Sequence, residues 1–291
     1  MNGLLLVNKP GGITSHDVVA RVRKITRESS VGHLGTLDPM ATGVLPLLLG
    51  RFTRLAQFFR EDGKMYTGHI RFGVATDTYD AMGAPVGEAC QPALSLAVIR
   101  EAASHFCGEI EQMPPPYSAK KIDGTPAYKL ARQGKPVVLR PARITVHRLE
   151  IAGYAAPDAT FAIEISSGGY IRSIAHEMGQ RLGCGAHLAS LCRTRAGRFD
   201  LEQTLTLDQI AALAGQGELE AAMPHPRTLL PELPAVTVDA RTAANLRNGM
   251  ACNLPEFSGS AHVKIFTAPA ELFAIGRRIA GTLIQPCAVL G

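Results

Sequence analysis

One segment of the chain reads Gly32-His33-Leu34-Gly35-Thr36-Leu37-Asp38-Pro39-Met40-Ala41-Thr42-Gly43-Val44-Leu45-Pro46. Asp38 is its single acidic residue, and no other acid lies between Glu28 and Glu61. Pro39 favours an extended backbone at Asp38, and the glycines allow tight turns. An isolated carboxylate at the edge of a buried strand is a candidate nucleophile. An aspartate before proline is also a common turn residue, so the residues alone leave both interpretations open.

The patterns on either side of this segment predict regular elements. Residues 4–7 are continuously apolar and predict a short buried strand. Apolar residues at helical spacing, with Thr14 as the cap and Asp17 three residues later, predict a helix over 15–27. The Gly- and Thr-rich residues 28–43 predict a loop, and residues 44–49 predict a second buried strand.

The rest of the chain alternates predicted strands and helices and then becomes β-rich. Four prolines within 223–234 indicate a domain boundary, and 235–291 reads as short strands separated by turns. The whole pattern predicts an α+β domain followed by a small β-rich domain. The predicted elements are strands over 65–72, 143–151 and 161–165, helices around 96–106, 171–182 and 206–213, and a long loop over 112–136.

Composition and motifs exclude several classes of protein. Hydrophobic residues make up 46% and charged residues 19% of the chain, which is typical of a folded rather than a disordered protein. The six cysteines contain no Cys-x-x-Cys pair, and phosphate-loop and dinucleotide motifs are missing, so we expect no metal and no cofactor. No apolar run approaches the ~18 residues of a membrane helix, and the N-terminus is unlike a signal peptide, so we expect a cytoplasmic protein. The net charge of +5 fits a polyanionic partner or an ordinary basic protein.

The segment around Asp38 resembles the signature of the TruB family, the bacterial tRNA pseudouridine-55 synthases. The resemblance implies the pseudouridine synthase fold, in which helices flank a central mixed, largely antiparallel sheet. It also implies a catalytic domain over 1–228, with an RNA-gripping insertion at about 112–148, and a PUA-like RNA-binding domain over 235–291. Further blocks that carry the resemblance are 3–10 with Thr14 and Ser15, 64–66, Gly73, 76–80, 115–121 with Gly124 and Tyr128, 168–173, 185–188 and Leu191.

The resemblance implies an isomerase that converts uridine to pseudouridine at position 55 in the T-loop of tRNA. Asp38 would be the essential carboxylate, and both attack on the sugar and a glycal-like route stay open. The target base must leave its stack to reach Asp38. Tyr66 matches the tyrosine that stacks on the uracil. Arg172 matches the arginine that pairs with the carboxylate and keeps it ionised.

Other residues match family positions around the substrate. Tyr170 is expected in the base pocket, and Leu191 is expected to pack on the uracil. His33 is expected to help hold the flipped-out part of the RNA loop. Lys9 is expected to support the Asp38 loop, and Asp80 to orient Tyr66 or to contact RNA.

The predicted insertion is strongly basic. Eight basic residues and a single acid lie between Tyr117 and Arg148. Phosphate contacts from such a segment would make RNA binding fall with salt, although a solvated charged loop has the same composition. The expected partner is the T stem-loop of tRNA, recognised by its shape and unstacked bases, and we expect a monomer. The basic candidates for RNA contact are Lys120 and Lys121, with a second cluster of Arg193, Arg195 and Arg198.

Four positions depart from the family pattern, and two of them are Phe52 and Arg54, which differ from the common Ala and Lys after Gly50. Gly169 stands where the family usually has Thr, and Cys192 replaces the first arginine of the usual pair. These departures concern local RNA contacts rather than Asp38. The main alternative is a non-catalytic RNA-binding protein or RNA chaperone on the same scaffold, and an additional tRNA-folding role stays open. A nucleoside-cleaving hydrolase is disfavoured because that chemistry normally needs a second carboxylate.

Overall fold

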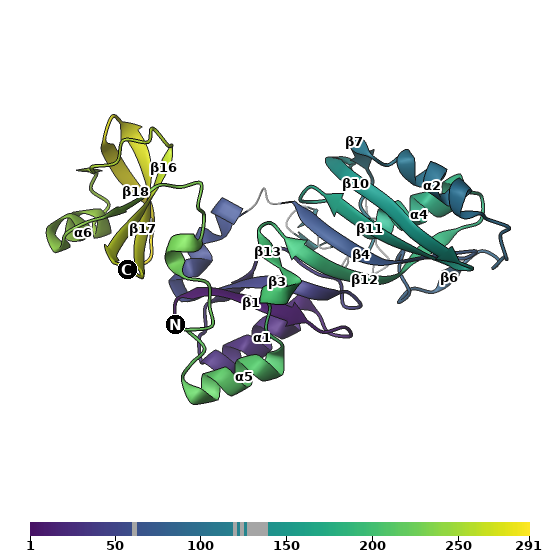
Figure 1. Ribbon diagram of the computed structural model, residues 1–291, viewed down its shortest axis with the longest axis horizontal. Helices are drawn as coiled ribbons and strands as arrows, with labels where there is room; N and C mark the ends of the chain where they lie inside the picture. Colours follow the sequence, from purple (N-terminus) through teal and green to yellow (C-terminus); the bar gives the residue numbers. More distant parts are fainter. Residues whose placement is uncertain (60–62, 119–120, 123–124, 127–138) are drawn as a thin grey trace.

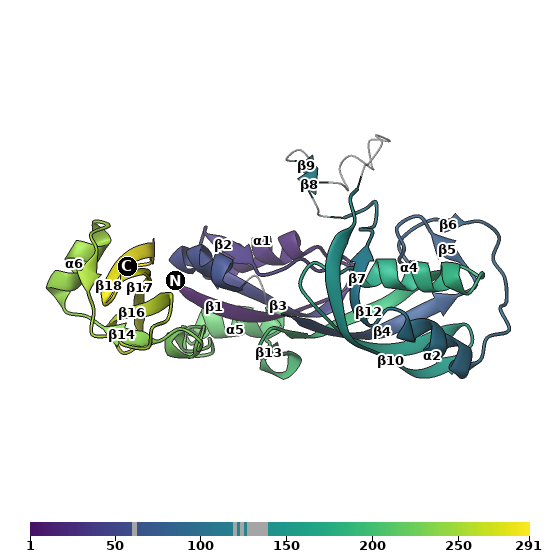
Figure 2. The same cartoon turned by 90° about the horizontal axis from the view of Figure 1, so that it is seen from above.

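The computed structural model describes residues 1–59, 63–118, 121–122, 125–126 and 139–291. The molecule is elongated, with a large sheet as its body and a small β-rich domain at one end, as Figure 1 and Figure 2 show from two sides. Within these ranges, no helix combines the length and the apolar character needed to cross a membrane.

A nine-stranded sheet forms the body of the molecule. Its neighbouring strands are antiparallel, except that β3 and β12 run parallel. The sheet is therefore mixed and largely antiparallel, which confirms the expected fold class. Its main path is β1 (Gly3–Lys9), β3 (Thr42–Leu49), β12 (Ala186–Ala196), β4 (Lys64–Phe72), β11 (Asp158–Ile165), β10 (Ala142–Ala155) and β7 (Gly108–Gln112), while β2 (Val31–His33) pairs with β3 and β13 (Phe199–Asp200) with β12.

The first strand is apolar without alternation because both of its faces are buried. Leu5 and Val7 pack in a core that includes residues of α1 (Ser15–Thr26) and α5 (Leu207–Gln216). Leu4 and Leu6 belong to a second core that is shared with the C-terminal domain. A strand covered on both faces shows the continuous hydrophobic run seen here.

Helices cover the two ends of the sheet (Figure 1). The helices α1 and α5 lie against each other beside β1, and Thr14 caps α1 through the predicted capping box with Asp17. At the other end, α4 (Ile171–Arg181) packs on β12 and α2 (Leu96–Ser104) packs on β10. The shorter elements are η1 (Gly50–Phe59), β5 (Ala75–Thr76), β6 (Pro85–Val86), η2 (Leu201–Gln203) and η3 (Pro226–Thr228).

Local patterns failed to predict two strands of the large sheet, and the predicted loop over 112–136 contains two short strands, Lys121–Ile122 and Thr125–Pro126. The predicted loop over 28–43 contains β2, a three-residue strand that pairs with β3 from Val31 to His33. The patterns also missed β12, a central strand that contacts both β4 and β3. Its sequence mixes apolar residues with Ser190, Arg193 and Arg195, so it shows neither strict alternation nor a continuous apolar run.

The C-terminal domain is built on a five-stranded sheet. Phe266 and Ile275 from this sheet belong to the same buried core as Phe52 of η1. Arg51 and Arg54 of η1 also donate hydrogen bonds to the carbonyl oxygens of the last strand and its exit. The domain therefore packs firmly on the body. Its elements are β14 (Ala235–Thr237), α6 (Ala240–Arg247), β15 (Cys252–Asn253), β16 (His262–Ala268), β17 (Glu271–Ala280) and β18 (Leu283–Val289).

The predicted insertion leaves the sheet where β7 ends and β10 begins. Gln112 and Ala142 are paired across these two strands. Between them, β8 (Lys121–Ile122) and β9 (Thr125–Pro126) pair with each other and stand away from the body in Figure 2. Lys121 therefore lies in β8, whereas Lys120 lies outside the described residues.

Candidate active site

Asp38 opens into a cavity of about 450 Å³ near the middle of the sheet. Tyr66 reaches the cavity from β4, and Leu191 reaches it from the adjacent strand β12. Tyr170 and Arg172 line it from the start of α4. The sheet and this helix thus bring together five predicted site residues that are far apart in the sequence.

Buried side chains from other elements hold the loop that carries Asp38. Ser15 donates from its Oγ to the carbonyl oxygen of Leu37 at 2.9 Å and accepts from the Leu37 amide at 2.8 Å. Arg193, fully buried in β12, donates to the carbonyl oxygens of Gly35 at 3.1 Å and Val44 at 2.7 Å. These bonds fix the backbone on both sides of Asp38.

The close pairing of β3 with β12 requires a glycine at position 43. Gly43 has a φ of +99°, and a Cβ there would lie 2.3 Å from the carbonyl oxygen of Arg193. Another residue would therefore be strained and would also force the two strands apart. Gly43 thus allows β3 to pair closely with β12 directly after the Asp38 loop.

Lys9 is a fully buried lysine at the end of β1. Its Nζ donates to the carbonyl oxygens of Pro10 at 3.0 Å, Pro39 at 3.1 Å and Ala41 at 2.7 Å. Burial lowers the pKa of Lys9 to about 8, although the charge of Asp38 opposes this shift. These contacts are those of a residue that supports the Asp38 loop.

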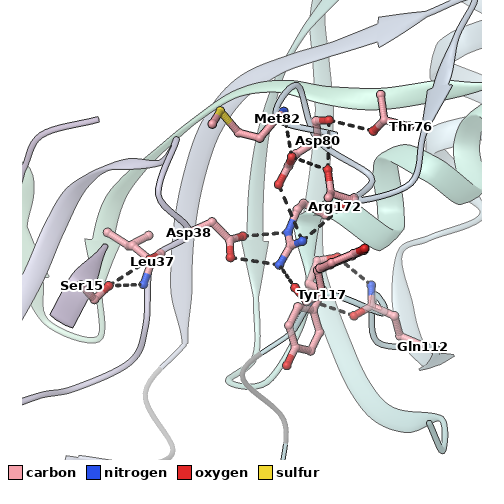
Figure 3. Close-up of polar contacts among 11 residues, drawn as sticks. Ser15, Leu37, Asp38, Thr76, Asp80, Met82, Gln112, Tyr117 and Arg172 are labelled. Atoms are coloured by element: carbon pink, nitrogen blue, oxygen red, sulfur yellow. Dashed lines mark hydrogen bonds and ion pairs between the residues drawn. The ribbon is translucent and has the colours of Figure 1, made fainter. Parts of the chain in front are cut away.

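Arg172 faces the carboxylate of Asp38 with two nitrogen atoms, as Figure 3 shows. Its Nε lies 2.8 Å from Asp38 Oδ2, and its Nη2 donates to Asp38 Oδ1 at 2.9 Å. The guanidinium also donates to the carbonyl oxygens of Thr78 at 3.0 Å and Tyr117 at 2.9 Å. Two-atom contact between a guanidinium and a carboxylate gives both strength and a defined orientation.

Opposing effects act on the ionisation of Asp38. Burial raises the pKa of Asp38 and the charge of Asp80 raises it further, whereas Arg172 and Lys9 lower it. The Asp38 side chain is 31% exposed, while that of Arg172 is only 4% exposed. The arginine is therefore enclosed, but one edge of the carboxylate still faces the cavity.

Asp80 lies against Arg172 and does not line the cavity. Its Oδ2 is 3.7 Å from Arg172 Nη1, and its Oδ1 accepts from Thr78 Oγ1 at 2.7 Å and from the Met82 amide at 3.0 Å. The family resemblance predicts that Asp80 orients Tyr66 or contacts RNA. These contacts instead make it a second carboxylate for the arginine.

His33 lines a neighbouring cavity of about 330 Å³ rather than the Asp38 cavity. Leu34, Phe59 and Phe199 form apolar walls there, and Lys64 lines both cavities. Burial, assisted by the charges of Arg193 and His16, lowers the pKa of His33. Any contact that His33 makes with RNA would therefore lie beside the pocket of the target base.

The prediction that Arg193 belongs to a second basic cluster for RNA contact is wrong. This arginine is fully buried under the Asp38 loop and cannot reach RNA. Arg195, in contrast, is 39% exposed and lies 3.4 Å from Glu164. The sequence does not separate the two roles because both arginines stand on the same strand two residues apart.

Sequence reasoning also missed Gln112 and the role of Ser15. Gln112 is buried at the end of β7, where its carboxamide makes two hydrogen bonds with the backbone of Tyr170. A glutamine just before a proline-rich segment gives no pattern that could have identified it. Ser15 stood in a matching block, but its contact with Leu37 depends on the tertiary fold.

Gly169 has a local packing reason in this chain. A Cβ there would lie 2.3 Å from Cδ1 of Ile165, which fills the space. Cys192 is half-buried in β12, where it pairs with Thr42 of β3. Among the described residues, no cluster of histidine, cysteine and acidic side chains is arranged to hold a metal ion.

Two protein-family models match this chain. A model described as "TruB family pseudouridylate synthase (N terminal domain)" matches residues 23–171. A model described as "tRNA pseudouridylate synthase B C-terminal domain" matches residues 172–231. The chain belongs to the TruB family.

Relatives of this TruB family member match it over most of its length. A tRNA pseudouridine synthase B of Solibacter usitatus is 43% identical over 293 residues, which cover 100% of both chains. One from Opitutus terrae is 47% identical over 213 residues, covering 73% of this chain and 88% of the relative. Among solved structures, a Cbf5-Nop10-Gar1 complex matches with a TM-score of 0.70 and 27% identity, covering 99% of this chain and 85% of the matched chain.

Proposed function

We propose that this chain converts uridine to pseudouridine at position 55 in the T-loop of tRNA, with Asp38 as the essential carboxylate. The observation that carries the proposal is the Asp38–Arg172 ion pair at an aromatic-lined cavity. Relatives named tRNA pseudouridine synthase B support tRNA as the substrate. A similar solved structure, described as an H/ACA RNP bound to a substrate RNA, supports an RNA ligand; it has a TM-score of 0.70 and 26% identity, covering 99% of this chain and 85% of that chain.

The reaction rearranges one nucleotide without adding or removing atoms. The bond between uracil N1 and ribose C1′ breaks, the base turns, and a new bond joins C5 to C1′. The proton on C5 is lost and N1 gains a proton, so electrons and atoms balance. The chemistry therefore needs a group that handles the sugar and a pocket that retains the detached base.

Asp38 is suited to act on the sugar. Attack of its oxygen on C1′ and removal of a ribose proton toward a glycal both require an ionised carboxylate with an open edge. Burial raises the pKa of Asp38, and the charges of Arg172 and Lys9 oppose this shift and so favour the ionised form. The exposed edge of Asp38 faces the cavity. Both routes are therefore compatible with the same contacts.

The cavity walls are suited to hold uracil. Tyr66 and Tyr170 supply aromatic rings, and Leu191 supplies an apolar side chain. We infer that the flipped base lies between these side chains while it turns. Base flipping requires roughly a few kcal/mol, which such stacking contacts can offset.

The position of Asp80 argues against a hydrolase. Glycosidases use two carboxyl groups that flank the scissile bond, with one as a general acid. Asp80 is buried against Arg172 and does not line the cavity, so it is not available for that role. A single carboxylate is sufficient for uridine because uracil can carry negative charge in its ring.

Several elements outside the cavity are proposed to bind the same RNA. We assign the insertion, with Lys120 and Lys121, to the stem-loop, and the PUA-like domain over 235–291 to further RNA contacts. His33 would contact nucleotides beside the target. The enzyme would act as a monomer in the cytoplasm, and a role in tRNA folding would rest on the same surfaces.

Mapping of pseudouridine in an unmodified tRNA transcript tests the proposal. After incubation with the protein, we expect conversion of the T-loop uridine at position 55 and no release of free uracil. Binding of tRNA without pseudouridine, for every tRNA tried, would contradict the proposal and favour an RNA-binding protein or chaperone. Free uracil would favour a hydrolase.

A further inference from the structure

The backbone at the start of α4 is held by a buried glutamine side chain. Tyr170 occupies the N-cap position of this helix, but its own side chain makes no capping hydrogen bond. Gln112, only 1% exposed, supplies the contact instead. Its Oε1 accepts from the Tyr170 amide at 2.7 Å, and its Nε2 donates to the Tyr170 carbonyl oxygen at 2.9 Å.

The chain that follows Gln112 makes two more contacts with the same helix turn. Ser173 donates from its Oγ to the carbonyl oxygen of Met113 at 2.7 Å. Arg172 donates from Nη2 to the carbonyl oxygen of Tyr117 at 2.9 Å. The segment from 112 to 117 therefore contacts Tyr170, Arg172 and Ser173, which together form the first turn of α4.

This turn carries two groups of the proposed active site. Tyr170 lines the cavity, and Arg172 pairs with Asp38. A rotation of the turn would move both side chains at once, because they are two residues apart on one rigid element. Small displacements of aligned groups reduce rates strongly, by up to about 100-fold for a shift near 1 Å.

We propose that Gln112 is a positioning residue for pseudouridine formation, because its carboxamide sets the orientation of Tyr170 and Arg172 toward Asp38. This inference rests on the proposed function. An amide side chain fits the task because it can donate and accept at the same time. Leucine can do neither, and would leave the Tyr170 amide without its present partner. An ionised glutamate could accept from the amide but could not donate to the carbonyl.

The first experiment compares the wild type with Gln112→Leu at saturating tRNA. We expect the single-turnover rate to fall by about 10- to 100-fold, with tRNA affinity changed less than about threefold. The matched control is Gln209→Leu, which removes an exposed glutamine that accepts from the backbone amide of Thr206 at the start of α5. The control should retain the wild-type rate.

A pH profile separates positioning from a purely structural role. Asp38 is faced by Arg172 and Tyr170 from α4, by Lys9 from β1 and by Asp80 from the segment between β5 and β6. If Arg172 is displaced, it no longer offsets the effect of burial on the pKa of Asp38, so this pKa should rise. The acid limb of the pH–rate profile should therefore move to higher pH in Gln112→Leu. A variant with merely reduced stability would keep the wild-type acid limb.

Gln112→Glu keeps the test decisive if Gln112→Leu does not fold. A protonated glutamate can again donate and accept, so the rate ratio of Gln112→Glu to wild type should rise as the pH falls. A constant ratio, or an unchanged rate in Gln112→Leu, would overturn the inference while the wild type remains active. An inactive wild type would instead overturn the proposed function, and the inference with it.

Discussion

The two sides of the Asp38 cavity are held together in opposite ways. On the aspartate side, which we define as residues 35–44, side chains of Lys9, Ser15 and Arg193 bond to the loop backbone. On the arginine side, which we define as Arg172 with Thr78 and Tyr117, the backbone carbonyls of Thr78 and Tyr117 accept hydrogen bonds from the Arg172 side chain itself. One side fixes the loop around its reactive group, and the other fixes the charged group directly.

This difference matches what the two groups are proposed to do. A carboxylate that acts on a sugar needs an open oxygen, so its loop is held while the side chain keeps an accessible edge. An arginine that only keeps this carboxylate oriented and ionised gains from enclosure, because a fixed guanidinium loses little freedom on pairing. Substitutions that disturb one side at a time should therefore have different effects on rate and stability.

The largest effect is expected when the arginine side loses its cation. Arg172→Met would leave Asp38 and Asp80 near each other without the guanidinium that lies between their oxygens. We expect the single-turnover rate to fall by at least about 1,000-fold, which corresponds to roughly 4 kcal/mol. Removal of one partner of a buried ion pair should also lower the free energy of unfolding by about 3–5 kcal/mol.

Two further variants sharpen this result. The double variant Arg172→Met, Asp80→Asn should recover part of the lost stability but not the rate, because it removes only the unpaired second carboxylate. Arg71→Met is the control, since Arg71 pairs with Asp158 at the surface, where its side chain is 47% exposed. Surface pairs contribute about 0–1 kcal/mol, so its unfolding should change little. A rate within tenfold of wild type in Arg172→Met would contradict the assignment.

A smaller effect is expected when the aspartate side loses its buried lysine. Lys9→Met would leave the carbonyl of Ala41 without its donor and would remove one of the two donors to the carbonyl of Pro39, which also accepts from the Gly12 amide. We expect the free energy of unfolding to fall by about 2–4 kcal/mol and the rate by about tenfold, since the loop is loosened but Asp38 and Arg172 remain. Chemical denaturation and single-turnover kinetics measure the two changes.

The pH dependence of stability provides a separate check on Lys9. The pKa of Lys9 is lowered by burial to about 8 in the folded protein, below the ordinary lysine value of 10.5. Between these values the unfolded chain binds more protons than the folded one, so stability rises with pH in this window. The advantage of wild type over Lys9→Met should therefore grow as the pH rises from 8 toward 10.5. An advantage that stays constant or shrinks across this window would show that Lys9 stays charged in the folded protein.

The smallest effect concerns the carboxylate behind the arginine. Asp80→Asn keeps an oxygen that can accept from Thr78 and Met82, but it removes a negative charge that raises the pKa of Asp38. The acid limb of the pH–rate profile should therefore move to lower pH, by less than about one unit. A profile measured at saturating tRNA checks this shift, and movement to higher pH would mean that Asp80 does not act through charge on Asp38.

The sequence predicted the parts of this fold and site that depend on local patterns or on long matching motifs. The strand at 4–7, the helix capped by Thr14 and the candidate group Asp38 are of this kind. The resemblance also paired Arg172 with Asp38, a contact that the structure contains. These features leave a signal in neighbouring residues.

Features that depend on three-dimensional packing left no such signal. Arg193 looked like a surface charge, but the approach of β12 to Gly43 buries it beneath the loop. Asp80 lies beside Arg172 because the segment between β5 and β6 folds back toward α4, which no spacing in the sequence reveals. Gln112 reaches Tyr170 from 58 residues away, since β7 ends beside the start of α4.

The most direct test of the account is the pseudouridine yield of Asp38→Asn under single-turnover conditions with excess enzyme and unmodified tRNA. Asparagine keeps the size of the side chain but cannot attack the sugar as a carboxylate or take its proton. We predict no detectable pseudouridine, with tRNA affinity within about threefold of wild type, while the matched surface variant Asp158→Asn stays active. Conversion by Asp38→Asn at a rate within tenfold of wild type would contradict the central role of Asp38.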